Sequence, residues 1–195
     1  GSSRVGTKLL MSGHGHCNIT HAGSIKDFPS CYGDAGKSIR KILYKYSNTD
    51  LVSFLDSRGI KTVTQEDGRV FPESMKAQDV RDAFLSASEQ NGFKVITNRK
   101  VVEIRPYDEE PLNDKTKEID TRKFILVAEA PDGQRFYYEA QHLVIATGGK
   151  SYPRSGSDGS MFDVVNEGLG LEHTELKPSL APLDIKGYPY GELSG

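Results

Sequence analysis

Residues 9–20 read LLMSGHGHCNIT, and a second stretch, residues 143–153, reads LVIATGGKSYP. The first places two glycines among small and polar residues, and the second is an apolar run that ends at Thr147-Gly148-Gly149. Glycine adopts positive φ values and leaves no Cβ between the backbone and a ligand. Two such sites in one chain indicate an anionic, nucleotide-like ligand that is held largely by backbone N–H groups.

Several stretches, in a fixed order, resemble the motifs of one known family. Residues 8–21 (KLLMSGHGHCNITH) resemble its KxLxSGGGRCNxT motif, and the further matches are residues 67–72 (DGRVFP) with Ser74, residues 98–104 (NRKVVEI), residues 143–153 with the following 155–157, and residues 178–183 (PSLAPL). The chain thus resembles the BaiN-like flavoproteins, which are NAD(P)/FAD-dependent oxidoreductases and include aminoacetone-oxidase-like members. Each piece alone is weak, but the ordered set is specific and covers nearly the whole chain.

The predicted elements follow an order of helices, hairpin, helix, strands, β meander and a buried strand. This order fits an α/β domain with an appended antiparallel piece. The resemblance implies a partial Rossmann-like FAD-binding domain of the glutathione-reductase type. Within residues 1–195 we expect a helical and strand part at 7–105, an exposed charged loop at 106–122, and a meander, buried strand and final helix at 123–195.

The family opens with a strand, a GxGxxG turn, a helix and an acidic second strand, and this sequence has none of these. It starts with Gly1-Ser2-Ser3, which is typical of a cloning remnant rather than of a native start. We therefore expect an internal fragment that lacks the N-terminal GxGxxG unit. Such a fragment would bind FAD weakly or not at all and would be inactive alone.

Hydrophobic periodicity and capping signals predict four helices. They are expected from Asp34 through Tyr46, from a cap at Thr49 to a stop at Gly59, over residues 77–91, and from Ser157 or Asp158 to about residue 167.

The alternation of apolar and polar residues, together with turn residues between such runs, predicts the strands. Residues 8–11 are expected to be extended, with hairpins at 60–65/69–71 and 124–130/135–140, strands at 94–97 and 100–105, and a buried parallel strand at 143–146.

The resemblance also implies which residues line the cofactor. They are Ser12, Gly13, Gly15, His16, Cys17, Asn18, Val101, Ala146, Thr147, Gly148, Gly149 and Tyr152. Val101 would pair its backbone with the adenine edge, although Val102 is one register slip away. The alternative is that both glycine stretches are tight turns without a ligand and that Val101 is a core residue.

The sequence contains no Ser-His-Asp pattern, P-loop or HExxH motif. This absence suits flavin chemistry, in which the cofactor transfers the hydride and the protein positions it. The resemblance implies an FAD-dependent oxidoreductase that moves a hydride between flavin and a small organic substrate, with NAD(P)H as a further candidate redox partner. His16 replaces the family's arginine, a permanent cation. That replacement motivates the alternative of a non-catalytic binding domain that has lost its cofactor.

A second alternative is a metal site, because imidazole and thiolate are ligands for Zn²⁺ or Cu²⁺. The candidate ligands are His14, His16, Cys17 and His21. Their spacing matches no standard zinc motif, and the family has Gly and Arg at two of these positions. We therefore expect no metal.

Composition narrows the classes of partner and of cellular location that the sequence allows. The net charge of −2 gives no reason to expect nucleic acid, and no apolar run approaches the length of a membrane span. Cys17 and Cys31 are too few for a disulfide scaffold, so we expect reduced thiols and a cytoplasmic protein.

Overall fold

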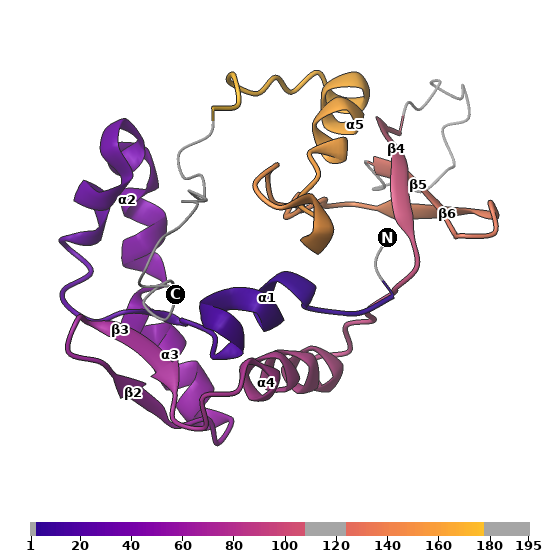
Figure 1. The fold of residues 1–195 in the computed structure, drawn as a ribbon. Coiled ribbons are helices and arrows are strands. Elements are labelled where there is room, and N and C mark those ends of the chain that lie inside the picture. Colours follow the sequence, from indigo (N-terminus) through magenta and orange to yellow (C-terminus); the bar gives the residue numbers. More distant parts are fainter. Residues whose placement is uncertain (1–2, 108–123, 178–195) are drawn as a thin grey trace, which may run out of the picture. The chain divides into compact units, whose positions relative to one another are not determined.

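A computed structural model describes residues 3–107 and 124–177 of the chain (Figure 1). Most of the expected charged loop and the whole PSLAPL motif lie outside the described residues. The chain divides into two compact units, one of Gly1–Lys100 with Ala130–Asp132 and the other of Val101–Glu129 with Gly133–Gly195. Among the described residues, no helix combines the length and the apolar character needed to cross a membrane.

The first unit combines helices with a small antiparallel sheet. Its elements are α1 (Thr7–Met11), η1 (Ser12–Gly15), β1 (Thr20–His21), η2 (Phe28–Ala35), α2 (Gly36–Lys45), α3 (Asn48–Ser57), β2 (Thr62–Thr64), β3 (Arg69–Pro72) and α4 (Ala77–Gln90). The strand order is β1-β3-β2, and Val70 pairs with Thr20 on one side and with Thr64 on the other. The hairpin expected around Gly68 is therefore confirmed.

The core of this unit forms where α4 meets α3 and the segment after η1. Its buried members are Cys17, Leu55, Ala77, Val80 and Ala83. The helical spacing of the α4 residues places them on one face, as the sequence predicted. Phe84 follows the same helical spacing but is 39% exposed, and its ring stacks 5.3 Å from that of Phe54.

Two predicted helices are confirmed as α2 and α3, but each begins at a different residue from the one predicted. Asp34 does not cap α2, which Ala35 precedes without a side-chain hydrogen bond. Ser47, not Thr49, caps α3 in a reciprocal capping box. The Asp50 backbone N–H donates to Ser47 Oγ at 3.2 Å, and the Ser47 N–H donates to the Asp50 carboxylate at 2.7 Å. The acidic side chain three residues after the cap decides the start, because it satisfies a second free N–H.

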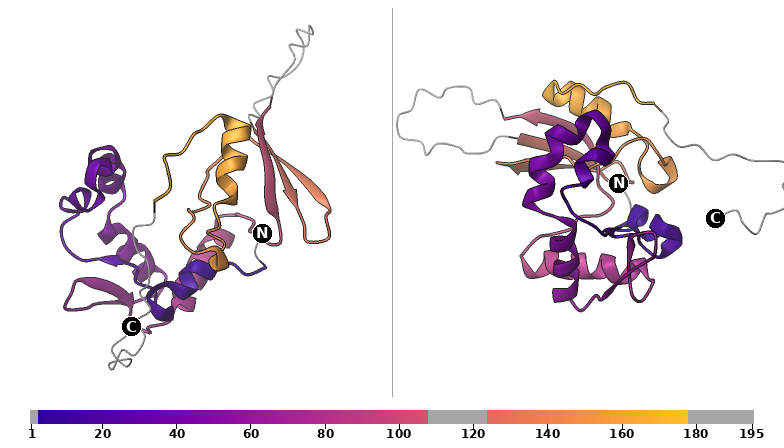
Figure 2. Two further views of the ribbon diagram at one scale, coloured as in Figure 1. Left: turned by 45° about the horizontal axis from the view of Figure 1, so that its top comes forward. Right: turned by 90° about the vertical axis from the view of Figure 1, so that its left-hand side faces the viewer.

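The second unit holds a three-stranded sheet and one longer helix. Its elements are β4 (Lys100–Pro106), β5 (Phe124–Glu129), β6 (Arg135–Ala140), η3 (Pro153–Ser155) and α5 (Ser160–Leu169). The order is β4-β5-β6, and β5 and β6 form an antiparallel hairpin in register from Phe124–Ala140 to Glu129–Arg135. The predicted meander is confirmed, and Figure 2 shows α5 running beside β4.

Helix α5 confirms the last predicted helix and corrects its cap. Gly159 is the N-cap, while the Asp158 carboxylate accepts from the Ser160 N–H at 3.0 Å. Gly170, with φ 62°, is the C-cap that ends the helix, slightly beyond the predicted end near residue 167. Gly168 packs so closely on β4 that an added Cβ would lie 1.8 Å from the Ile104 carbonyl oxygen.

Three strand predictions are wrong. Residues 8–11 belong to α1, whose Leu9 and Leu10 pack against the core of the first unit. Residues 94–97 and 143–146 form no strand, and Val144 is 86% exposed. A strand requires a hydrogen-bonded neighbour, and among the described residues no strand pairs with either run. Apolar runs alone therefore did not predict the strands.

Candidate functional site

Residues 12–18, the glycine loop, form a tight structure with several positive φ angles. Gly13 and His14 both have φ 56°, and a Cβ on Gly13 would lie 3.1 Å from the Asn18 nitrogen and from the Phe71 ring. The His16 N–H donates to the Gly13 carbonyl at 3.0 Å, and the Cys17 N–H donates to Ser12 at 2.9 Å. These two amides close the loop instead of facing a ligand.

The predicted residues of the glycine loop differ in exposure. Gly13, His16 and Asn18 are exposed, whereas Ser12 and Gly15 are half-buried. Cys17 is only 4% exposed and belongs to the core of the first unit. Burial raises the pKa of the Cys17 thiol, so it stays protonated. Cys17 thus anchors the loop, while the Asn18 side chain is free to meet a ligand.

Strand β3 and its turn support the glycine loop. The Arg69 Nε donates to the Asp67 carboxylate at 2.6 Å, and the Arg69 guanidinium lies 5.6 Å from the centre of the Phe71 ring. A hydrogen bond from the Arg69 backbone N–H is the main cause that lowers the pKa of Asp67. Phe71 in turn contacts Gly13. The DGRVFP sequence therefore positions the glycine loop.

The second predicted stretch lines a cavity of about 260 Å³ in the second unit, which we call the α5 cavity. Its lining residues are Ile145, Ala146, Thr147, Gly148, Met161, Phe162, Val165, Leu171, Glu172 and His173. Three of the predicted site residues are among them. Gly148 has φ 73°, which a residue with a side chain adopts only with strain.

Helix α5 supplies the wall of this cavity that sequence reasoning missed. Met161, Phe162 and Val165 lie on one side of the helix, and the Phe162 ring packs 4.5 Å from the imidazole of His173. The apolar spacing in residues 161–165 was the available signal. It predicted a helix but not what the helix faces.

The remaining predicted residues lie outside this cavity lining. Tyr152, 45% exposed, forms a β-bridge with Ser157, and Gly149 is half-buried. Val101 is half-buried near the start of β4. Their contact with a cofactor stays a prediction.

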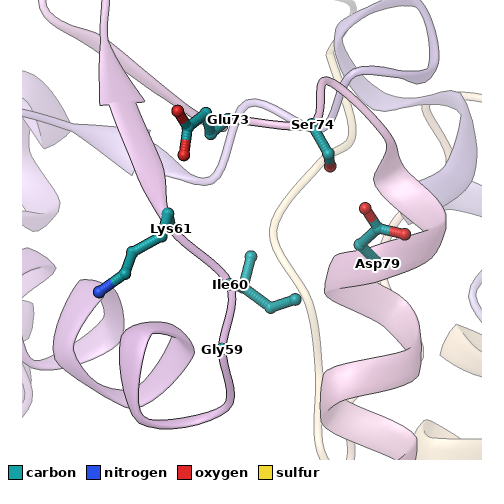
Figure 3. A pocket seen from close by; sticks show the side chains of 6 residues that line it. All are labelled: Gly59, Ile60, Lys61, Glu73, Ser74 and Asp79. Atoms are coloured by element: carbon teal, nitrogen blue, oxygen red, sulfur yellow. The ribbon is translucent and has the colours of Figure 1, made fainter.

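A hollow of about 340 Å³ in the first unit contains none of the predicted residues (Figure 3). Gly59, Ile60, Lys61, Glu73, Ser74 and Asp79 line it. Lys61 donates to Asp56 at 2.6 Å, and Figure 3 shows its side chain pointing away from Asp79. The hydrogen bond to Asp56 is the main cause that raises the pKa of Lys61, and the charge of Glu73 contributes less.

The metal alternative gains no geometric support. Within the part of the chain that the structure describes, no three His, Cys, Asp or Glu side chains form a group that could hold an ion. His21 instead contacts the carbonyl oxygens of Ala22 at 2.7 Å and Asp67 at 2.9 Å.

Comparison with known proteins assigns the fold family. The family described as the HI0933-like protein Rossmann domain matches residues 1–176. The chain belongs to this family. The resemblance to the flavoprotein oxidoreductases and the α/β, partial Rossmann-like fold class expected from the sequence are thereby confirmed.

Two curated relatives are similar over most of the chain. A 3-dehydro-bile acid delta(4,6)-reductase of Clostridium scindens is 26% identical over 98% of this chain. A ribosomal RNA dihydrouridine synthase of Haemophilus influenzae is 25% identical over 94% of it. The chain spans 41% of the length of each relative. At this distance the comparison supports an FAD-type oxidoreductase family and no particular substrate.

Proposed function

We propose that the protein to which this chain belongs is a cytoplasmic FAD-dependent oxidoreductase. It moves a hydride between flavin and a small organic substrate, with NAD(P)H as the second redox partner. The observation that carries the proposal is the α5 cavity, in which Ala146, Thr147 and Gly148 meet the apolar side of α5. Family membership supports the same cofactor class.

The lining of the α5 cavity fits part of a flavin. Met161, Phe162 and Val165 offer an apolar wall to a flat heteroaromatic group, and Thr147 and His173 add polar atoms. Gly148 lets the backbone approach without a Cβ. A volume of about 260 Å³ takes one portion of a dinucleotide, so the rest of FAD would lie on other residues, with Val101 of the same unit among our candidates.

When bound, FAD supplies the hydride chemistry, while the chain's own groups position the reactants and exclude water. Thr147 and the backbone at Gly148 would orient the bound ring, and the apolar side chains of α5 would keep water from it.

The names of the two relatives suggest a substrate class. One is named a delta(4,6)-reductase of a 3-dehydro-bile acid, and the other a synthase of dihydrouridine, the hydrogenated form of uridine, in ribosomal RNA. We extend this to a substrate with a double bond conjugated to a carbonyl group. One carbon of the bond takes the hydride and its neighbour takes a proton.

The test begins with the visible absorption spectrum of the purified protein, followed by release and identification of any cofactor. FAD is then titrated into the chain, for which we expect weak binding because its sequence lacks a GxGxxG turn. Gly148→Ala should weaken this binding further, at least tenfold. Gly133→Ala is the matched control, because Gly133 also has a positive φ but has no neighbour within 4 Å of an added Cβ. Equal losses in both variants would contradict a site at Gly148.

A second candidate is a non-catalytic binding domain that has lost its cofactor. It is favoured by His16, which stands where the family has a permanent cation. A protein that is colourless as purified and stays colourless on FAD titration would support this candidate over the first. Restoration of flavin binding by His16→Arg would identify the lost group.

A further inference from the structure

Two titratable side chains line the α5 cavity, and both follow the end of α5. They are Glu172 and His173. The reaction proposed above adds a hydride to one carbon of a double bond and a proton to its neighbour, so it needs a proton donor. The rest of the described lining consists of apolar residues, a glycine and Thr147, whose hydroxyl does not ionise near neutral pH. Within this lining the donor is therefore Glu172 or His173.

Two contacts orient the imidazole of His173. Its ring lies 4.5 Å from that of Phe162, at an angle of 48°. Its Nδ1 lies 2.8 Å from the Thr174 carbonyl oxygen. A carbonyl oxygen only accepts, so Nδ1 carries a hydrogen and donates it. Nε2 is left as the nitrogen that exchanges a proton with a ligand.

An imidazole suits this step better than a carboxylate. A glutamate side chain is ordinarily ionised at neutral pH and then only accepts hydrogen bonds. Imidazole changes its charge between about pH 5 and 8, so it both gives up and regains a proton under working conditions. His173 is exposed, which lets water return the proton after each turnover.

Glu172 is the one other charged group in the described lining. The residues that α5 contributes are apolar, and so are those of the opposite wall apart from Thr147. The charge state of His173 therefore has one neighbouring carboxylate to be tested against.

We propose that His173 is a catalytic residue of the reaction proposed above, on which this inference rests, and that its Nε2–H gives the substrate its proton. The substrate's β carbon takes the hydride from reduced flavin, which is thereby oxidised, and the carbon–carbon π bond breaks. The α carbon takes the proton as the Nε2–H bond breaks, and that electron pair stays on Nε2. Water then restores the proton to the imidazole.

The first test places His173 beside the flavin ring without relying on turnover. FAD is titrated into the chain, and NMR follows the Gly148 amide and the Cε1–H signals of the histidines. The flavin ring should shift the His173 signal and leave that of His142, which lies outside the lining, unchanged. A shift at Gly148 without one at His173 would overturn the inference alone. Absence of a shift at both would also contradict the α5 cavity as the flavin site.

The second test uses the full-length protein with its flavin reduced by dithionite in the absence of oxygen. Return of the oxidised flavin absorbance on addition of 2-cyclohexen-1-one or a steroid 4-en-3-one reports reduction of the substrate. His173→Gln should slow this step at least about 100-fold per bound flavin, the usual contribution of a general acid. His142→Gln, outside the lining, should retain the wild-type rate.

The outcomes of this second test separate the two proposals. A His173→Gln protein as fast as the wild type would overturn the role of His173 and leave the proposed function standing. If neither enone reoxidises the reduced flavin of the wild-type protein, the proposed function is contradicted and this inference with it.

The pH profile distinguishes a proton donor from a residue that only shapes the cavity. The wild-type rate should fall as pH rises through the neutral range, because the imidazolium is lost. His173→Gln should remove that fall, whereas Glu172→Gln should retain it. Imidazole added to the His173→Ala protein should restore part of the rate. A fall that persists in His173→Gln and disappears in Glu172→Gln would show that the carboxyl group is the donor.

Discussion

Cys17 shows how one residue connects the glycine loop to the fold. Its φ is 61°, its N–H donates to Ser12, and its thiol lies in the core with Leu55 and Val80. A positive φ in a non-glycine residue costs free energy, which burial of the side chain offsets. The loop therefore keeps its shape without a ligand, which is useful for a binding site because less ordering is required on binding.

The buried thiol gives a pH dependence of stability. Because burial raises the pKa of Cys17, the unfolded state loses its proton at lower pH than the folded state. The stabilisation is complete below the ordinary thiol pKa of about 8.5 and is lost as pH rises above it. We expect the free energy of unfolding, measured in urea, to fall between pH 8 and 10 by at most about 1.4 kcal/mol per pH unit.

Matched variants isolate this effect. Cys17→Ala should remove that part of the pH dependence, whereas Cys31→Ser should retain it, because Cys31 is exposed. In the native protein a thiol reagent should modify Cys31 rapidly and Cys17 only after unfolding. Equal reactivity of both thiols would show that the glycine loop is not anchored as described.

The capping box of α3 is an element-scale feature. Replacing Ser47 with Ala removes the acceptor for the Asp50 N–H and should lower the free energy of unfolding by about 1 kcal/mol. Thr49→Ala tests the cap predicted from the sequence: the Thr49 hydroxyl lies 2.8 Å from that of Ser47, but Ser47 is the cap, so the loss of Thr49 should cost less. A larger effect from Thr49 in urea denaturation would restore the cap predicted from sequence.

The capping box also carries a pH dependence. Hydrogen bonds from the Ser47 backbone and hydroxyl lower the pKa of Asp50. The sign is opposite to that of Cys17. The stabilisation is present above the ordinary carboxyl pKa and is lost as pH falls through the lowered one.

Packing of α5 on β4 reverses a common rule. Ala in place of Gly inside a helix normally stabilises it by about 1 kcal/mol. Gly168→Ala should destabilise the second unit instead, because the new Cβ would lie 1.8 Å from the Ile104 carbonyl oxygen. Gly149→Ala serves as the control, since an added Cβ there has no neighbour within 4 Å. A rise in Tm for Gly168→Ala would mean that α5 does not pack there.

Elements whose signals are local were predictable from the sequence. The α4 stripe, the turn at Gly68 and the β5–β6 hairpin each depend on a few neighbouring residues, and all three are confirmed. Residues 8–11 read as extended, yet they form a helix because Leu9 and Leu10 pack on a core that the local sequence does not reveal. Tertiary contacts override local preference in such short segments.

Part of the α5 cavity lining was identified from the sequence. Ala146, Thr147 and Gly148 belong to a motif stretch and line this cavity, while their contact with a cofactor stays a prediction. Its opposite wall on α5 depends on how a helix packs, which spacing alone does not give.

At the scale of the whole molecule, two apolar runs have no strand neighbour among the described residues. Residues 94–97 and 143–146 have the composition of buried parallel strands, and yet Val95 is 50% and Val144 86% exposed. Neither run pairs with another strand within the described residues. Exposed apolar runs with free backbone groups are sites where another strand can add.

This arrangement predicts uneven amide hydrogen exchange along the chain. Amides of residues 94–97 and 143–146 should exchange within seconds to minutes, because exposed backbone without ladder hydrogen bonds opens at little cost in free energy. Val127 and Ala128 should exchange far more slowly, because β5 is the central strand of its sheet and both side chains are buried. Mass spectrometry measures deuterium uptake in peptides from all three regions of the same labelled sample. The β5 peptide then serves as the internal control for the other two. Protection of residues 143–146 equal to that of β5 would mean that this run is paired in solution, and the α5 cavity beside it would then be bounded by a strand instead of an open segment.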